Sequence, residues 1–241
     1  MEILRHGAAA LGLQLTDQQV ERFRTYYQAL LEGNRRVNLT TVTDAEGVQR
    51  RHFLESLAVG AALHRHGIRP WGTPARFLDV GAGAGFPGLP IRLADAAVRL
   101  VLLEATAKKA AFLSHLTTRL GLGEVAVLAE RAETAARDPA HRESYDIVLA
   151  RAVAPLPALL ELTLPFLRTG GVLAAPKGSG AAQEVAASAR ALRELGGRLR
   201  LSEPLPVPDG GPQPVLVLVE KVAPTPERYP RRPGVPTKRP L

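Results

Sequence analysis

Residues 1 to about 70 show the hydrophobic spacing of α-helices. A Thr16-Asp17 pair is a typical N-terminal capping signal, and Gly33-Asn34 ends the pattern that follows it. Within that stretch the apolar side chains recur at helical intervals, at Val20, Phe23, Tyr27, Leu30 and Leu31. A second helical run extends from His52 to about His64, and prolines and a glycine over 70–74 indicate a linker. The pattern predicts an N-terminal helical extension over residues 1–70.

From residue 75 onward, short apolar segments alternate with helical ones. The expected strands cover residues 76–80, 100–103, 124–128, 145–149 and 171–175. Helical patterns fill the intervals, notably Lys108 to Leu120 and Ala181 to Leu195. Strands and helices that alternate in this way predict an α/β domain, in which a mostly parallel sheet carries helices on both faces.

Two further strands are expected near the C-terminus, over residues 198–205 and 214–222. The turn signal Pro208-Asp209-Gly210-Gly211 lies between them. Because so short a connection joins antiparallel neighbours, one of the two strands should run against the rest of the sheet. The sequence therefore predicts a seven-stranded, Rossmann-like domain over residues 75–222, followed by a tail over residues 223–241.

Composition narrows the class of protein. The chain has 241 residues, of which 46% are hydrophobic and none is cysteine. The absence of cysteine excludes disulfides, thiolate metal sites and cysteine nucleophiles. No apolar run reaches the roughly 18 residues that a membrane-spanning helix needs. The N-terminus has no convincing signal-peptide cleavage pattern, so we expect a cytoplasmic protein.

The charge of the chain favours a polyanionic partner such as a nucleic acid, because the net charge is +8. Residues 223–241 contain five basic residues and one acid, which is half of the excess. The same segment contains six prolines. We therefore expect this tail to be extended until an anionic partner orders it.

The most informative local motif follows the first predicted strand and precedes a helix. It has the spacing D-x-G-x-G-x-G, with its acid and glycines at Asp79, Gly81, Gly83 and Gly85. The dinucleotide-binding fingerprint requires glycine where Phe86 stands, and a P-loop requires lysine where Leu89 stands. Alternate glycines allow a ligand to lie against backbone N–H groups. The motif resembles the first motif of class I S-adenosylmethionine (SAM) methyltransferases, in which this loop faces the amino-acid part of the cofactor.

An acidic residue follows the second predicted strand. Glu104 lies 19 residues after Gly85, where an acid in a dinucleotide-type fold accepts both ribose hydroxyls. Ala105-Thr106 would then flank the ribose and the adenine edge. After the third strand, Ala132-Glu133 offers a backbone N–H and a carboxylate that suit the adenine ring nitrogen and its amino group. A solvated acid or a helix-start acid remains the alternative interpretation of Glu104 and Glu133.

The segment that closes the fourth strand limits the methyl acceptor. Enzymes that methylate exocyclic amines of bases typically carry a [DNS]-P-P-aromatic run there, and this chain has Ala150-Arg151-Ala152. Methylation of carbon 5 of pyrimidines requires a cysteine, which this chain lacks. Oxygen and ring-nitrogen acceptors remain. Guanine N7 fits well, because its free lone pair needs no general base.

Two cations follow strand ends near this site. Arg151 and Lys177 are candidates to pair with a phosphate, the guanine edge or the cofactor carboxylate, and a solvated sheet edge is the alternative for both. His52 is expected on a helix surface. The histidines form no recognisable metal-binding motif, so we expect no metal.

Several further segments resemble the bacterial 16S ribosomal RNA guanine-N7 methyltransferase family RsmG, formerly called the glucose-inhibited division protein B family. The matching segments are Asn38-Leu39-Thr40, Arg51 to Leu57, Asp79 to Pro90, Lys108-Lys109, Phe112-Leu113, Arg131-Ala132-Glu133, Arg151-Ala152, Pro176-Lys177-Gly178 and Tyr229 to Leu241. The glycine loop and the terminal segment are the most specific of these. The chain departs from the family at Glu55, where Asp is usual, and at Ala82, where Ser is common.

The resemblance implies a SAM-dependent enzyme with the class I methyltransferase fold. Its implied product is 7-methylguanine in the 530 loop of 16S rRNA, at guanine 527 in ribosomal RNA numbering, together with S-adenosylhomocysteine. The implied cofactor contacts are Gly81, Phe86, Glu104, Ala105, Thr106, Ala132, Glu133 and Arg151. We expect 16S rRNA or the small ribosomal subunit as the partner. The enzyme should be a monomer and should not contact a membrane. Methyl transfer should need no side-chain base, so we name no catalytic residue.

Basic and polar residues outside the cofactor set are the candidate RNA contacts. They are Asn38, Arg51, His52, Lys177, Arg231, Arg232 and Lys238, with Arg35 and Arg36 in the polar segment after the first long helix. A solvated surface position is the alternative for each. Two other functions stay open, a nicotinamide-dependent oxidoreductase of similar fold and a non-catalytic RNA-binding module. The glycine spacing argues against the first, and the intact loop with Glu104 argues against the second.

Overall fold

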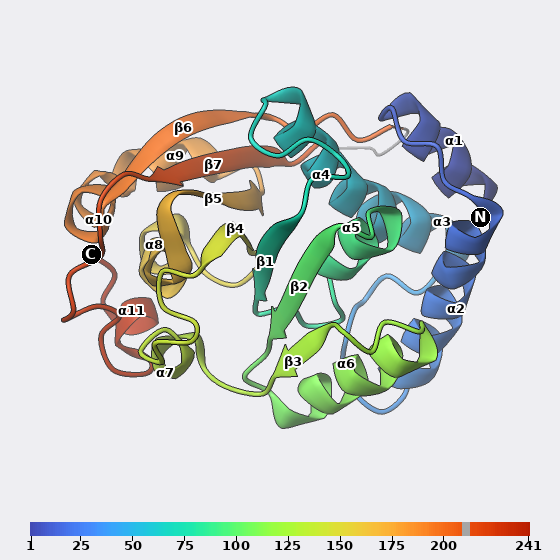
Figure 1. Cartoon of the computed structure of the whole chain (residues 1–241), viewed down its shortest axis with the longest axis horizontal. Coiled ribbons are helices and arrows are strands. Elements are labelled where there is room, and N and C mark those ends of the chain that lie inside the picture. Colours follow the sequence, from blue (N-terminus) through green and yellow to red (C-terminus); the bar gives the residue numbers. More distant parts are fainter. Residues whose placement is uncertain (209–212) are drawn as a thin grey trace.

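A computed structural model describes residues 1–208 and 213–241, and a twisted sheet forms its centre (Figure 1). The strands are β1 (Ala75–Val80), β2 (Val98–Leu103), β3 (Ala126–Leu128), β4 (Tyr145–Leu149), β5 (Leu167–Lys177), β6 (Gly197–Pro204) and β7 (Val215–Lys221). Within the described residues they form a seven-stranded sheet in the order β3-β2-β1-β4-β5-β7-β6. Strands β1 to β5 pair in parallel, and β7 runs antiparallel to β5 and β6. The predicted α/β sheet is confirmed, while residues 209–211 of the predicted turn lie outside the described residues.

Helices cover both faces of the sheet because the strand side chains alternate between two apolar layers. In β4, Ile147 and Leu149 belong to one layer, and Val148 belongs to the other. Helices that join the first layer include α2 (Asp17–Asn34), α4 (Glu55–Arg65), α5 (Gly88–Ala94) and α6 (Ala107–Arg119). The second layer is closed by α8 (Leu156–Thr163), the short helix η2 (Leu164–Phe166) and α10 (Ala189–Leu195), with α9 (Ala181–Ala187) beside α8. Both faces of a parallel sheet are thus buried, as βαβ connections require.

The N-terminal helices are built onto the first apolar layer. They comprise α1 (Glu2–Ala10), α2, α3 (Ala45–Val48), the π-helical segment η1 (Gln49–Leu54) and α4. A capping box between Thr16 and Gln19 begins α2, as its sequence indicates. Tyr26 is fully buried, whereas Tyr27, one of the positions of the predicted helical pattern, is half-buried and packs against the first layer. The reason is a tertiary contact, because the Tyr26 hydroxyl donates a hydrogen bond to the carbonyl of Ala84 in the glycine loop, at 2.6 Å.

The C-terminal segment is folded against the domain, so the expectation of an extended tail is wrong. Figure 1 shows this segment in red beside α7 (Ala132–Ala135) and α8, and it contains the one-turn helix α11 (Val235–Lys238). Arg142 donates hydrogen bonds to the carbonyls of Thr225 and Tyr229, at 2.8 and 3.0 Å. Arg231 pairs with the fully buried carboxylate of Glu161 at 2.6 Å. Buried polar groups of the body require partners, and the tail supplies them.

The division of the chain at residues 70–75 and 222–223 stays a prediction.

Among the residues that the structure describes, no helix is long and apolar enough to cross a membrane.

Candidate functional site

The glycine loop between β1 and α5 has a backbone that side chains would disturb. Gly81, Gly83 and Gly85 have φ angles of +67°, +59° and +100°, in the left-handed region that glycine favours. A Cβ atom on Gly81 would lie 2.7 Å from Val153, and one on Gly85 would lie 2.5 Å from Leu89. The loop therefore needs glycine both for its conformation and for close packing.

Glu104 holds the middle of this loop from the end of the neighbouring strand β2. One carboxylate oxygen accepts a hydrogen bond from the Gly83 N–H at 3.0 Å, and the other accepts one from the Thr106 N–H at 2.7 Å. The side chain is buried, with 6% of the residue exposed. The interpretation of Glu104 as a solvated acid is therefore wrong, because the residue is buried and its carboxylate accepts hydrogen bonds from the backbone of Gly83 and Thr106.

Asp79 lies beneath the loop at the end of β1 and is fully buried. One carboxylate oxygen accepts a hydrogen bond from the Gly88 N–H at 2.8 Å. The other, Oδ1, has no hydrogen-bond partner among the described residues. Burial raises the pKa of Asp79 to about 7. A buried carboxylate with one unsatisfied oxygen is suited to a cationic group on a ligand.

A cavity of about 190 Å³ opens beside the loop and brings together residues from several strand ends. Its lining includes five of the predicted cofactor residues, Gly81, Glu104, Ala105, Ala132 and Glu133. The tail also reaches this cavity through Thr237. The buried Glu133 carboxylate accepts a hydrogen bond from the Gly234 N–H at 2.7 Å. Neither Thr237 nor Gly234 was predicted here, because nothing in the local sequence indicates that the tail folds back.

Phe86, the last predicted residue of the loop, lies in a stack of rings. The ring of Tyr26 is 5.3 Å away on one side, and the ring of His52 is 4.6 Å away. The guanidinium of Arg151 lies 5.1 Å from the ring centre of Phe86, at cation–π distance. The stack joins the N-terminal helices to the loop. In the sequence, the aromatic residue at position 86 was the one local feature that pointed to such a contact.

The expectation that His52 is a helix-surface residue is wrong, because only 9% of it is exposed. Its Nε2 atom lies 2.8 Å from the Thr40 hydroxyl, and its Nδ1 atom lies 3.2 Å from the Arg151 guanidinium. Burial, together with the charge of Arg151, lowers the pKa of His52 to about 4. The imidazole is therefore neutral near pH 7.

A second cavity, of about 540 Å³, is lined by Arg151, whose guanidinium lies against the Phe86 ring of the glycine loop. The residues that give it its chemistry are Arg51, His52, Glu55, Arg151, Lys177 and Glu184. Arg151 follows β4 at a strained point of the backbone, since Ala152 has a φ of +56°. The structure thus brings three of the predicted RNA residues together with Arg151. Glu55 was not among them, although it stands within the predicted segment Arg51 to Leu57.

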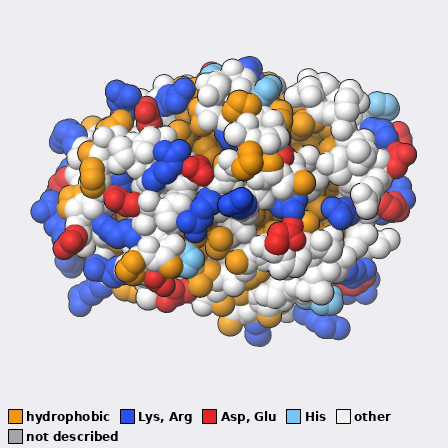
Figure 2. All heavy atoms as spheres, viewed as in Figure 1, with side chains coloured by type: hydrophobic (Ala, Val, Ile, Leu, Met, Phe, Trp, Pro, Cys, Tyr) orange, Lys and Arg blue, Asp and Glu red, His pale blue; other side chains and the backbone are white. Residues whose placement is uncertain are grey.

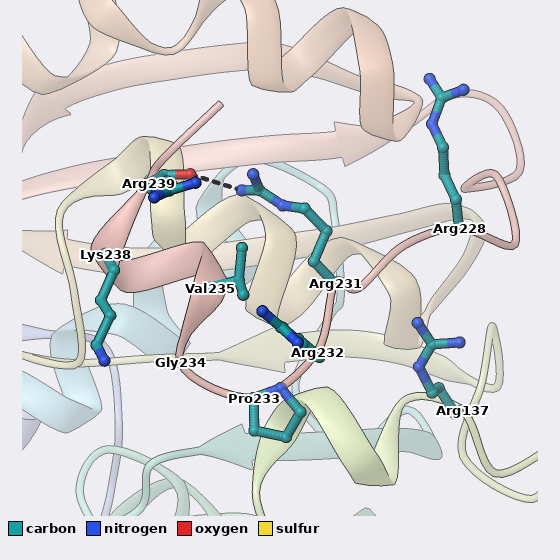
Figure 3. A pocket seen from close by; sticks show the side chains of 9 residues that line it. All are labelled: Arg137, Arg228, Arg231, Arg232, Pro233, Gly234, Val235, Lys238 and Arg239. Atoms are coloured by element: carbon teal, nitrogen blue, oxygen red, sulfur yellow. Dashed lines mark hydrogen bonds between the residues drawn. The ribbon is translucent and has the colours of Figure 1, made fainter.

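The cations of the tail line a third cavity, of about 800 Å³ (Figure 3). Arg231, Arg232 and Lys238 all contribute, together with Arg137, Arg228 and Arg239. Arg231 is engaged by Glu161 and by the Arg239 carbonyl, whereas Arg232 and Lys238 have no such partner among the described residues. Within the described residues, Arg232 and Lys238 of the predicted set, together with the Arg239 guanidinium, are therefore tail cations that are free to meet an anion.

The remaining candidates lie apart from the cavity of about 190 Å³ beside the glycine loop. Asn38 is exposed after α2, and Arg35 and Arg36 line a cavity of about 710 Å³ beside α6. On the face that Figure 2 displays, Lys and Arg side chains are spread over the whole width with acidic side chains among them. Among the described residues, no group of three His, Asp or Glu side chains is arranged to hold a metal ion.

Two kinds of comparison place the chain among known proteins. The family described as rRNA small subunit methyltransferase G matches residues 19–200. A protein of Roseiflexus sp. (strain RS-1), named Ribosomal RNA small subunit methyltransferase G, is 48% identical over 242 residues, and the match covers 100% of both chains. These matches exclude the nicotinamide-dependent oxidoreductase as an alternative.

Solved structures share the fold at low sequence identity. A SAM-dependent O-methyltransferase from Thermotoga maritima has a TM-score of 0.51 and 16% identity, over 80% of this chain and 71% of that one. The 1,6-didemethyltoxoflavin-N1-methyltransferase of Burkholderia thailandensis, solved with S-adenosylhomocysteine, has a TM-score of 0.52 and 18% identity, over 88% of this chain and 92% of that one. The sheet is thus that of class I SAM methyltransferases, and the chain belongs to the rRNA small subunit methyltransferase G family of SAM-dependent enzymes.

Proposed function

We propose that this enzyme methylates N7 of a guanine in the 530 loop of 16S rRNA, free or in the small subunit. The observation that carries the proposal is that Arg151, which lines one cavity with Arg51 and Lys177, lies against Phe86 of the glycine loop. Cations beside the methyl-donor site suit an acceptor that is embedded in a polyanionic strand. The full-length relative named Ribosomal RNA small subunit methyltransferase G supports the same substrate class.

The residues of the first cavity, together with the buried Asp79 at the end of β1, fit SAM. The unsatisfied Oδ1 of buried Asp79 suits the ammonium of its amino-acid part, and the glycine backbone leaves room for that part above the loop. Glu104 would accept the ribose hydroxyls, and Ala132-Glu133 would contact the adenine through a backbone N–H and a carboxylate. Bound SAM supplies a methyl group on a positively charged sulfur.

The chain's own part in the reaction is to position and shield the acceptor. Guanine N7 has a free lone pair, so no proton has to be removed before transfer. His52 is neutral near pH 7, and its two ring nitrogens are held by Thr40 and Arg151. We assign it the role of fixing Arg151 rather than that of a base. Arg232 and Lys238 would bind RNA phosphates farther from the reacting base.

Transfer of labelled methyl from SAM to unmethylated 16S rRNA, free and in small subunits, tests the proposal. Borohydride reduction followed by aniline cleaves RNA at 7-methylguanine. We expect one labelled cut, in the 530 loop. Label without a cut would place the methyl on another atom, and a cut elsewhere would place it at another guanine. Either result would contradict the proposed acceptor while leaving the methyltransferase family intact.

The pKa of Asp79 predicts a pH dependence of SAM binding. Because the pKa of this carboxyl is raised to about 7 in the free enzyme, the group is protonated in acid and ionised above neutrality. A cationic ligand prefers the ionised form, so its binding releases a proton. Affinity should therefore rise by up to about tenfold per pH unit from pH 5.5 to 7, and then level off.

Calorimetry in two buffers of different ionisation heat measures the proton release directly. The variant Asp79→Asn keeps an acceptor for the Gly88 N–H but cannot ionise, so its SAM affinity should be weaker and flat over this pH range. Titration of SAM itself affects both proteins equally. If the SAM affinity of Asp79→Asn rose with pH as steeply as that of the wild type, Asp79 would not be the residue that binds the ammonium group.

A further inference from the structure

The second cavity, of about 540 Å³, is lined by two carboxylates, Glu55 and Glu184, and they are not equivalent. Oε2 of Glu184 pairs with the Lys177 ammonium at 2.7 Å and accepts a hydrogen bond from the Leu156 N–H at 2.6 Å. Glu55 has one partner among the described residues, Arg151 at 3.2 Å, and its side chain is 20% exposed. Glu184 is thus held against Lys177 and the start of α8, whereas Glu55 pairs with Arg151, the cation beside Phe86, and has acceptor capacity left for a ligand.

The position of Glu55 is set by an unusual helical turn. It begins α4 directly after the π-helical segment η1, a type of irregularity that is often found at functional sites. Within that segment the Arg51 carbonyl accepts a hydrogen bond from the Arg151 guanidinium at 2.9 Å. Glu55 and the Arg51 carbonyl thus hold Arg151 from one side, while the Phe86 ring lies against it at 5.1 Å. The Glu55 carboxylate, the Arg151 guanidinium and the Phe86 ring of the glycine loop therefore follow one another in space.

The atoms along one side of guanine follow a matching order. N1–H and the 2-amino group are adjacent donors, O6 comes next and is an acceptor, and N7 follows. A carboxylate suits the two donors and a guanidinium suits O6, which directs N7 toward the glycine loop. Adenine has an amino group in place of O6 and no 2-amino group, so it would meet both groups wrongly.

We propose that Glu55 recognises the target base, by accepting hydrogen bonds from N1–H and the 2-amino group of guanine while Arg151 donates to O6. This assignment rests on the proposed guanine-N7 acceptor. It makes Glu55 both a specificity-determining residue and a catalytic residue, since the carboxylate touches the base that reacts.

The same contact stabilises the charge that methylation creates. The N7 lone pair forms the new bond to the methyl carbon, and the carbon–sulfur bond breaks with its electron pair remaining on sulfur. No proton moves, and the positive charge passes from sulfur to the purine ring. A carboxylate hydrogen-bonded to the ring therefore interacts more strongly with the transition state than with the neutral base, which accelerates transfer.

Inosine tests the assignment because it is guanosine without the 2-amino group. We would prepare 16S rRNA by ligation with guanosine or inosine at the target, in the form that accepts label in the assay above. Wild-type enzyme should bind and methylate the inosine RNA more weakly, by roughly tenfold or more, through loss of one charge-assisted hydrogen bond. Dissociation constants measured with S-adenosylhomocysteine present and single-turnover rates give two independent readouts.

In Glu55→Gln, the preference for guanosine RNA over inosine RNA should nearly disappear, both in the dissociation constants and in the single-turnover rates. The rate with guanosine RNA should drop roughly tenfold or more because the charge is lost. Glu55→Asp keeps the charge and should retain discrimination. Glu46→Gln, an exposed glutamate on α3, is the matched control. Unchanged melting temperature and SAM affinity would show that each variant is folded.

Full discrimination by Glu55→Gln, in binding and in rate, would overturn the assignment. Failure of the proposed function has a different signature, because wild-type enzyme would then give no cut at the guanosine target. The two failures are therefore distinguishable.

Discussion

Replacing Glu104 with alanine is expected to weaken SAM binding by a factor of roughly 10 to 100. Two effects add. The variant loses the charge-assisted hydrogen bonds proposed for the ribose hydroxyls, on the order of 1.5–3 kcal/mol. It also releases the N–H groups of Gly83 and Thr106, which the carboxylate holds at 3.0 and 2.7 Å. Titration calorimetry with SAM measures the change.

Two variants separate these effects. Glu104→Gln retains an acceptor oxygen and the packing but loses the charge, so its affinity should lie between wild type and Glu104→Ala. Glu46→Ala removes an exposed glutamate elsewhere and should bind SAM as wild type does. An unchanged dissociation constant in Glu104→Ala would take Glu104 out of the cofactor site and leave it as a support of the loop.

Replacing Arg231 with alanine is expected to destabilise the protein by about 3 kcal/mol, because it leaves the Glu161 carboxylate buried without its cation. Glu161 is fully buried, and both of its oxygens accept from the Arg231 guanidinium, at 2.6 to 3.0 Å. In a chain of this size the loss corresponds to a fall in melting temperature of roughly 6–12 °C. Thermal unfolding followed by circular dichroism measures it.

Arg232→Ala is the matched control in the same cavity. Arg232 is exposed, so its removal should change stability by less than about 0.5 kcal/mol. The Arg232→Ala substitution should still lower RNA affinity, and it should reduce the slope of log affinity against log salt concentration by about one. Adding Glu161→Gln to Arg231→Ala should restore part of the lost stability, since a neutral amide needs no cation. If Arg231→Ala melted at the wild-type temperature, other contacts would hold the tail.

The tail also changes what a truncation should do. An extended tail could be removed without affecting SAM binding, but Thr237 lines the cavity proposed for SAM, and the Gly234 N–H donates a hydrogen bond to Glu133. Deletion of residues 224–241 is therefore expected to weaken SAM binding as well as RNA binding, and the single variant Arg232→Ala is the cleaner test of RNA contact. Calorimetry on the truncated protein decides between the two expectations.

The sequence by itself determined the elements and the loop, because these depend on local physics. Alternation of apolar segments specifies parallel strands and covering helices, and three spaced glycines after Asp79 specify a turn that bares backbone N–H groups. The spacing from Gly85 to Glu104 placed an acid beside that turn, since parallel strands end at the same edge of a sheet.

Only the tertiary structure decided which side chains meet. Tyr26 rather than Tyr27 is buried because Ala84, 58 positions later, offers it a carbonyl. His52 is buried because Phe86 and Arg151 come from other elements to cover it. The tail is folded because Glu161 and Arg142 lie where it passes. Such contacts join residues far apart in the chain, and no local periodicity or capping signal encodes them.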